Sequence, residues 1–267
     1  MKRLLGVVGL LLACALGSAQ RSSLPSGREL VERHVAAIGG AAAFGNVRSV
    51  RMRGRFEMTG QNISAEFEQL GARPNKLLLR ADITGIGHTE TGFDGVNAWS
   101  IDPATGPRVL KDREHDEAVA DADFDGTLHL PGHVKELTTV GRADFDGRQA
   151  FKVHVVLANG VEQDEYFDTQ SGLEIGWEAK RSTPLGVVPT TAILRDYKKF
   201  GALMHPTTLV QKALFVEQVL HITSVEYNVV PANTFEPPAA IKALLKDRKS
   251  TRLNSSHVSE SRMPSSA

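Results

Sequence analysis

The 267-residue chain has one cysteine, Cys14, which lies near the N-terminus. The rest of the chain can form no internal disulfide and carries no thiol nucleophile, so its fold must depend on an apolar core. Basic and acidic residues are equally frequent, with 31 of each. A balanced charge provides no basic surface for nucleic acid. The composition therefore argues against a disulfide-rich domain, a thiol enzyme and a nucleic-acid-binding protein.

Motifs for catalysis and cofactors are also missing. The sequence has no G-x-S-x-G nucleophile elbow, no H-E-x-x-H zinc motif and no P-loop lysine. His129 and His133 are four residues apart, but Pro131 between them disfavours the helix that a zinc pair would need. We therefore expect no cofactor and no metal. Scattered His, Asp and Glu residues still leave an enzyme as a third hypothesis.

Residues 1–19 have the pattern of a secretory signal. Lys2 and Arg3 precede an apolar run that is too short to span a membrane, and small residues follow at positions 17–19. Cleavage after Ala19 would release the protein into the periplasm. The stretch "LLAC" offers an alternative, because it resembles a lipoprotein cleavage box in which Cys14 is lipidated and tethers the protein to a membrane.

The C-terminal segment, residues 247–267, is polar and serine-rich and has no apolar periodicity. Its residue order matches the read-through translation of a sequencing adapter, and a genuine disordered tail is the alternative. Residues 20–246 are therefore expected to form the folded part. Without both ends, this part has a small excess of acidic residues.

The folded part begins with a helix signal and continues with strand signals. Ser26 and Glu29 form a capping box before apolar residues at helical spacing, and Gly39-Gly40 ends that pattern. Residues 50–58 then alternate between apolar and charged, which is typical of a half-buried antiparallel strand. Similar short runs follow with turn signals between them. A polar stretch from about Asp112 to Ala122 reads as a mid-chain helix. The fold class is thus mainly β, as a meandering antiparallel sheet.

The stretch "DADFDG" resembles the start of a calcium loop, because aspartates alternate before Gly126 at Asp121, Asp123 and Asp125. A calcium loop ends with a bidentate glutamate at its twelfth position, and that position is Gly132 here. We therefore interpret the segment as a turn that ends the polar helix.

Apolar side chains recur at strand positions that share one face of the predicted sheet. They either fill a solid core or line a cavity for an apolar ligand. The set consists of Met52, Phe56, Phe67, Leu77, Leu79, Trp99, Phe151, Val153, Val155, Phe167, Ile175 and Trp177.

Blocks along residues 26–238 resemble one known family. They include "ELVERHVAAIGG", "RPNKLLLRAD", "GFDGVNAWSIDPATGP", "YFDTQSGL" and "HITSVEYNVVPANTFEPP". Together and in this order, they are similar to bacterial outer-membrane lipoprotein-sorting proteins of the LolA/LolB-like superfamily. The resemblance implies an unclosed antiparallel β-barrel, a half-barrel whose apolar cavity is covered by the N-terminal helix and a mid-chain lid that includes Ala118 and Val119. Arg51, Arg53 and Arg55 are the candidates for the family's functional arginine.

These observations predict a periplasmic binding or carrier protein for a lipid or lipoprotein acyl chain, without catalysis. Envelope proteins are candidate partners. The alternative is a structural or interaction module of the envelope with a filled core. A measured cavity of several hundred Å³ would favour the carrier, whereas native packing density would favour the module.

Overall fold

The structure is a computed structural model that describes residues 23–183 and 186–246. The predicted signal at residues 1–19, the cysteine at position 14 and the predicted tail at residues 247–267 lie outside the described residues.

The N-terminal helix α1 (Gly27–Ala37) forms where the capping box predicts it. The Ser26 side chain accepts a hydrogen bond from the Glu29 backbone N–H, and the Glu29 carboxylate accepts one from the Ser26 N–H at 2.7 Å. Gly40 ends the pattern with a φ of 86°, which favours glycine. A second short helix, α2 (Ala41–Gly45), follows at once and was not predicted.

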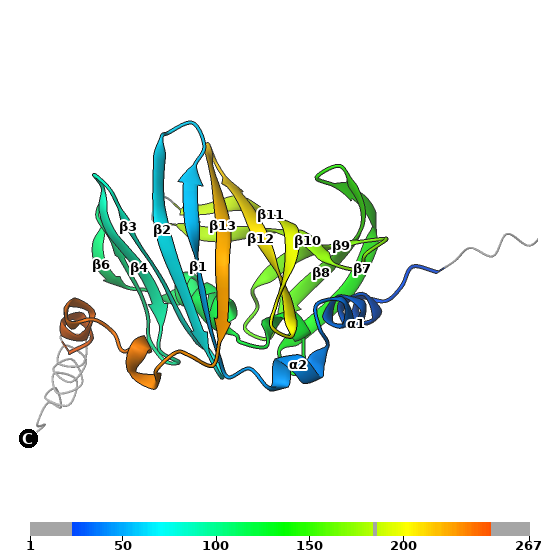
Figure 1. The fold of residues 1–267 in the computed structure, drawn as a ribbon, viewed down its shortest axis with the longest axis horizontal. Coiled ribbons are helices and arrows are strands. Elements are labelled where there is room, and N and C mark those ends of the chain that lie inside the picture. The colour runs from blue at the N-terminus through cyan, green and yellow to red at the C-terminus, as the bar shows by residue number, and fades with distance from the viewer. Residues whose placement is uncertain (1–22, 184–185, 247–267) are drawn as a thin grey trace, which may run out of the picture.

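Thirteen strands of the described residues form one antiparallel sheet, in the order β6-β5-β4-β3-β2-β1-β13-β12-β11-β10-β9-β8-β7 (Figure 1). Neighbours in the sheet are neighbours in sequence except where β1 pairs with β13 and so joins the two ends of the chain. The strands are β1 (Ser49–Met58), β2 (Ile63–Ala72), β3 (Lys76–Ile83), β4 (Gly87–Phe93), β5 (Ala98–Asp102), β6 (Gly106–Val109), β7 (Val134–Phe145), β8 (Arg148–Leu157), β9 (Glu162–Asp168), β10 (Glu174–Thr183), β11 (Gly186–Phe200), β12 (Leu203–Ala213) and β13 (Val216–Tyr227).

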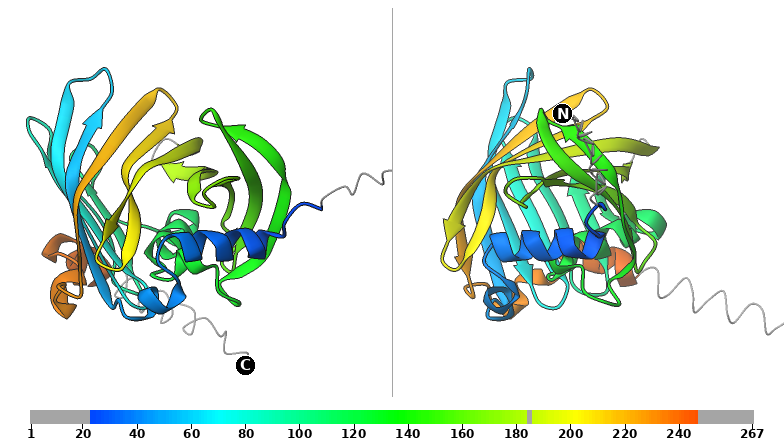
Figure 2. Two further views of the ribbon diagram at one scale, coloured as in Figure 1. Left: turned by 45° about the vertical axis from the view of Figure 1, so that its right-hand side comes forward. Right: turned by 90° about the vertical axis from the view of Figure 1, so that its right-hand side faces the viewer.

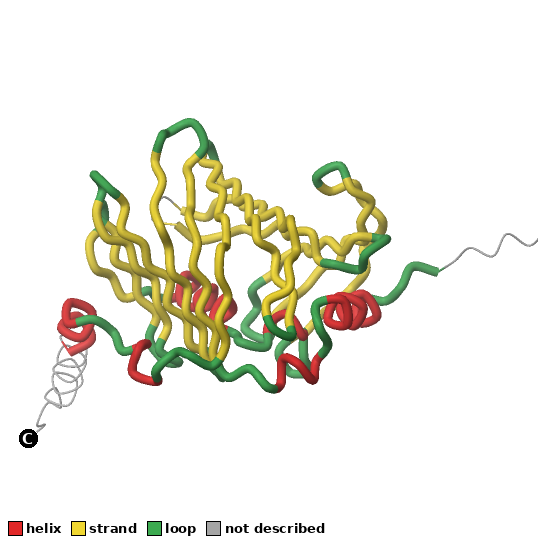
Figure 3. Tube along the Cα trace, viewed as in Figure 1, coloured by secondary structure: helices red, strands yellow, loops and turns green. Residues whose placement is uncertain are grey.

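The sheet curves strongly but does not close, since β6 and β7 remain its two edges (Figures 2 and 3). Helix α3 (Asp112–Ala122) is inserted between the two halves of the meander, at the residues that the sequence predicts. The predicted fold class is therefore confirmed: the protein is mainly β, an unclosed antiparallel β-barrel with an N-terminal and a mid-chain helix.

A bulge in β13, opposite β1, helps to bend the sheet. The pairing of β1 with β13 shifts between Arg53 and Gly54. A Cβ atom on Gly54 would lie 2.0 Å from the carbonyl oxygen of His221, so only glycine allows the two backbones to approach this closely. The local chain path therefore depends on a residue without a side chain.

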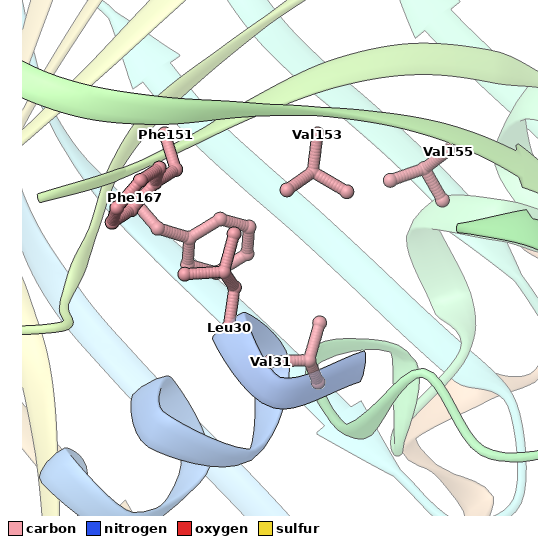
Figure 4. Close-up of a cluster of buried hydrophobic side chains, with 6 residues drawn as sticks. All are labelled: Leu30, Val31, Phe151, Val153, Val155 and Phe167. Carbon is pink, nitrogen blue, oxygen red and sulfur yellow. The ribbon is translucent and has the colours of Figure 1, made fainter. Parts of the chain in front are cut away.

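Both faces of the sheet carry buried clusters. On the concave face, α1 places Leu30 and Val31 against a cluster from β8 and β9 (Figure 4). On the convex face of β2–β5, the C-terminal segment covers a second cluster with Phe235, which precedes the helical residues 239–246, and with Ile241 within them. The C-terminal segment thus covers the convex side of β2–β5, and α1 covers the concave side of β8 and β9.

Candidate functional site

A cavity of about 340 Å³ lies on the concave face of the sheet. Its walls come from α1, α2, the end of α3, and strands β1–β3 and β10–β13. Met52, Leu77 and Leu194 contribute apolar side chains from three parts of the sheet. Ligand pockets in proteins span roughly 300–1,000 Å³, so the cavity is large enough for a small ligand or part of a larger one.

Five of the predicted lining residues share the concave face of β1–β3. Met52 and Leu77 line the cavity directly. Phe56, Phe67 and Leu79 continue the same face, because residues two apart on a strand, and residues directly opposite on paired strands, point to the same side. This part of the sheet is the apolar wall that the alternation predicts.

Phe151, Val153 and Phe167 also face the concave side, but they form a core. Each is buried, and they pack with Leu30 and Val31 of α1 (Figure 4). Helix α1 therefore fills the space over β8 and β9, and the cavity lies beyond it, towards β1–β3.

Trp99 and Ile175 require correction, because the structure places both away from the cavity. Trp99 is fully buried on the convex face, where it packs with Leu70 and Leu78 and its indole N–H donates to Glu90 Oε1 at 2.8 Å. Ile175 lies in a bulge, where the pairing of β10 with β9 shifts between Glu174 and Gly176. The bulge reverses the alternation and turns Ile175 to the convex cluster.

Trp177 remains on the concave face. It pairs with Ala192, which lies two residues from the cavity-lining Leu194 on β11. The Arg181 guanidinium lies 6.0 Å from the centre of the indole ring. Of the two tryptophans, Trp177 is therefore the one that shares a face with the cavity.

Helix α3 crosses the concave face and is fixed at both sides. Ala118 and Ala122 are buried against Phe93 and its neighbours on β4 and β5, and Val119 packs beside them. On the opposite side, the buried Glu117 carboxylate accepts hydrogen bonds from Ser182 of β10, at 2.9 Å from its N–H and 3.1 Å from its hydroxyl. Sequence reasoning considered only the few apolar residues of this helix and missed its polar link to β10.

The turn after α3 is the segment that resembles a calcium loop. Its three carboxylates have three different partners: Asp121 pairs with Arg181, Asp123 with His133 and Asp125 with Arg73. Residues 126–128 then form a short 3₁₀ turn. The segment is thus a turn that ends α3, as interpreted from the sequence, and its carboxylates link α3 to neighbouring elements.

A buried polar cluster adjoins the cavity beneath α1. His129 Nε2 lies 2.9 Å from Glu165 Oε1, and these residues are 5% and 2% exposed, respectively. Burial opposes protonation of the imidazole, yet the charge and hydrogen bond of Glu165 raise the pKa of His129 to about 9. The pair is therefore an imidazolium and a carboxylate at neutral pH.

Two further members of this cluster reach the cavity wall, His34 and Glu174. His34 Nδ1 accepts a hydrogen bond from the Glu174 backbone N–H at 3.0 Å, and burial lowers the pKa of His34 to about 4. Burial and then the charge of Glu165 raise the pKa of the Glu174 carboxyl well above its usual range. His34 is thus uncharged at neutral pH, and the uncharged form of Glu174 is favoured.

The sequence held a signal for this cluster. Phe167 was predicted to face inward, and Glu165 lies two residues before it on β9, so it had to share that face. A charged residue at an inward position needs a buried partner. The partner, His129, is on the turn after α3 and could not be identified from spacing.

Solved structures share this architecture at low sequence identity. A LolA superfamily protein from Nitrosomonas europaea matches with a TM-score of 0.53 and 11% identity, over 80% of this chain and 99% of the other chain. A DUF1329 family protein from Desulfovibrio piger matches with a TM-score of 0.53 and 12% identity, over 79% and 95%. A candidate outer membrane lipoprotein-sorting protein domain from Vibrio parahaemolyticus matches with a TM-score of 0.50 and 12% identity, over 79% and 96%.

The chain has a LolA-like fold. The fold that the resemblance implies is thereby confirmed. No family model and no curated protein sequence matches the chain. Among the helices of the described residues, none is both long and apolar enough to cross a membrane.

The buried pair makes the stability of this LolA-like domain dependent on pH. The folded-state pKa of His129, about 9, is above its unfolded value of about 6.5. The stabilisation is therefore complete below about pH 6.5 and is lost as the pH rises through about 9. Glu174 acts in the same direction, because its protonated form is favoured in the folded state. We expect the free energy of unfolding to fall by on the order of 2 kcal/mol between neutral pH and about pH 9.5.

Urea unfolding at the two pH values measures this loss. The control is His129→Gln, which can still donate a hydrogen bond to Glu165 but cannot titrate, and its stability should change less over the same range. An equal pH dependence in both proteins would show that the His129–Glu165 pair is not the cause.

Proposed function

We propose that this protein is a periplasmic binding or carrier protein that holds an acyl chain of a lipid or lipoprotein in the concave cavity. The observation that supports this proposal most directly is the cavity of about 340 Å³, whose apolar wall includes Met52, Leu77 and Leu194. Apolar surface left open inside a sheet can be covered by a hydrocarbon chain, which gains about 25 cal/mol for each Å² removed from water. The LolA-like fold supports the proposal at the level of architecture.

The cavity favours this proposal over a filled-core envelope module. In a solid core, the inward side chains would pack at native density and leave few voids larger than a water molecule. Here α1 fills one part of the concave face, and the part between β1–β3 and β10–β13 stays open. If the predicted signal or the lipidated cysteine directs export, envelope proteins would deliver and accept the ligand.

The polar cluster makes catalysis a second candidate. His34 and Glu174 line the cavity, and Glu165 and His129 lie behind them. His129 and Glu165 pair with each other, and His34 Nδ1 accepts a hydrogen bond from the Glu174 N–H. The carrier proposal predicts that an ester ligand is bound without being hydrolysed, whereas an enzyme would turn it over.

Titration with a fluorescent fatty-acyl probe tests the proposal. We expect saturable binding of one probe per chain and a change in tryptophan emission. Trp177→Phe should remove most of the tryptophan signal and keep the probe's own signal, because Trp177 lies on the cavity face. Trp99→Phe is the matched control and should keep both signals, since Trp99 lies on the convex face.

Absence of saturable probe binding to the lipid-free wild-type protein would refute the carrier and leave the filled-core module. Turnover of an acyl ester by the wild-type protein, lost in Glu174→Gln, would favour an enzyme instead.

A further inference from the structure

Three carboxyl groups line this mainly apolar cavity, and two of them already have partners, since Asp121 pairs with Arg181 and Asp123 with His133. The third is that of Glu174. The strand register sets Glu174 opposite Phe167, whose side chain packs against α1 on the concave face. The Glu174 side chain therefore points to the same side. Glu174 and His34 both line the cavity. Among residues 23–183 and 186–246, no side chain or backbone group forms a hydrogen bond with the Glu174 carboxyl group.

The backbone of Glu174 is fixed from both sides. Its N–H donates to His34 Nδ1 at 3.0 Å, and its carbonyl accepts a hydrogen bond from the Tyr197 hydroxyl at 2.8 Å. The bulge at the next residue sets the direction in which β10 continues. Helix α1 and strand β11 thus hold the backbone of Glu174 in place before any ligand arrives, which lowers the entropy that binding must cost.

The groups around this carboxyl determine its charge. His129 and Glu165 form a compensated ion pair, and His34 is neutral because burial lowers its pKa to about 4. The Tyr197 hydroxyl is also neutral, because burial raises its pKa. Burial and the charge of Glu165 raise the pKa of the Glu174 carboxyl and so favour its protonated form. Beside α1, the cavity wall therefore presents a carboxyl group without a hydrogen-bond partner whose favoured form can donate an O–H.

We propose that the Glu174 carboxyl is the polar anchor of the cavity and donates a hydrogen bond to an uncharged oxygen of an acyl lipid, such as a hydroxyl or an ester carbonyl. This inference rests on the proposed function and specifies its ligand class. The polar end of the ligand lies beside α1, and its chain runs past Leu194 towards Met52 and Leu77 on β1 and β3.

Charged head groups fit this anchor poorly. An ammonium group would need an ionised carboxylate. A ligand carboxylate beside Glu174 would lose its hydration without a cation to pair with, because the ammonium of Lys76, which also lines the cavity, lies 5.9 Å from the centre of the Phe235 ring. A hydrocarbon without any oxygen would leave the carboxyl unsatisfied, and such a loss typically weakens binding by about tenfold. The site therefore selects uncharged, oxygen-bearing acyl lipids.

Competition by four ligands with the same chain tests this selectivity. In this experiment, displacement of the fluorescent fatty-acyl probe is measured for the wild-type protein, Glu174→Gln and Glu174→Leu. The competitors are decanol, methyl decanoate, decane and decylamine. Glu66→Gln is the control, because Glu66 is exposed on the convex face of β2. In the wild type and the control, decanol and methyl decanoate should bind about tenfold more tightly than decane.

In Glu174→Leu this preference should vanish while decane binding is kept or improved, and Glu174→Gln should retain most of it because the amide still donates. Equal binding of decanol and decane to the wild type would overturn the inference and leave the carrier proposal intact. Tightest binding of decylamine would also overturn it, since the carboxyl would then be ionised. If none of the ligands binds the wild type, the carrier proposal itself fails. Should Glu174→Leu not fold, the wild type and Glu174→Gln still decide the question.

Discussion

Replacing Trp99 by alanine should lower the free energy of unfolding by about 3–5 kcal/mol, the range for removing a large aromatic side chain from a core. Trp99 is fully buried between the sheet and the C-terminal segment, with Phe235 and Ile241 among its neighbours. Its loss would leave a void and would also remove the hydrogen-bond donor of Glu90. Urea unfolding followed by circular dichroism measures the change.

Trp177→Ala is the matched comparison, because Trp177 is only partly buried and lies on the cavity face. It should cost less stability than Trp99→Ala and should weaken acyl binding more. A stability loss below about 1 kcal/mol for Trp99→Ala would contradict the assignment of Trp99 to the convex core.

Leu194→Trp should reduce the affinity for the fatty-acyl probe by at least about tenfold. Leu194 lies on β11 between the apolar residues of β1–β3 and the polar end of the cavity at Glu174. An indole at this position would occupy the space that the acyl chain needs. Overpacking of a core typically costs about 1–3 kcal/mol, but here the open cavity can accept part of the added volume.

Probe titration measures the affinity, and thermal unfolding checks that the variant is folded. Val187→Trp is the control, because Val187 is an exposed position of the same strand. Undiminished binding in a folded Leu194→Trp protein would show that the acyl chain binds elsewhere.

The local elements could be predicted because their signals are local. The capping box at Ser26 and Glu29 needs only one turn of helix, and the bounds of α3 follow from a polar stretch between strands. Alternation in β1 assigned Met52 and Phe56 to the concave face correctly. In each case, the deciding residues lie close together in the sequence.

The prediction of which residues line the cavity failed where distant residues or bulges determine the direction of a side chain. Trp99 has the pattern of an inward residue, but Phe235 and Ile241 cover its side of the sheet from the other end of the chain. A bulge that no residue pattern predicts directs the Ile175 side chain to the convex face. Phe167 faces inward as predicted, yet α1 covers it, so facing the concave side is not the same as lining the cavity.

The polar groups escaped sequence reasoning for a related reason. A glutamate in a helix or a strand is most often solvated. Nothing near Glu117 of α3 or Glu165 of β9 in the sequence identifies its partner. The partners, Ser182 and His129, are brought close only when the sheet curves and α3 crosses it. The candidate anchor at Glu174 likewise depends on the register of β9 with β10.

Native mass spectrometry of the full chain, purified from a bacterium without detergent, tests the central claim most directly. The account predicts a wild-type species that carries one acyl lipid per chain, identified in the organic extract, and a Leu194→Trp protein largely without it. A wild-type protein found only at its lipid-free mass, with no acyl lipid in the extract and no uptake of added acyl probe, would contradict the account.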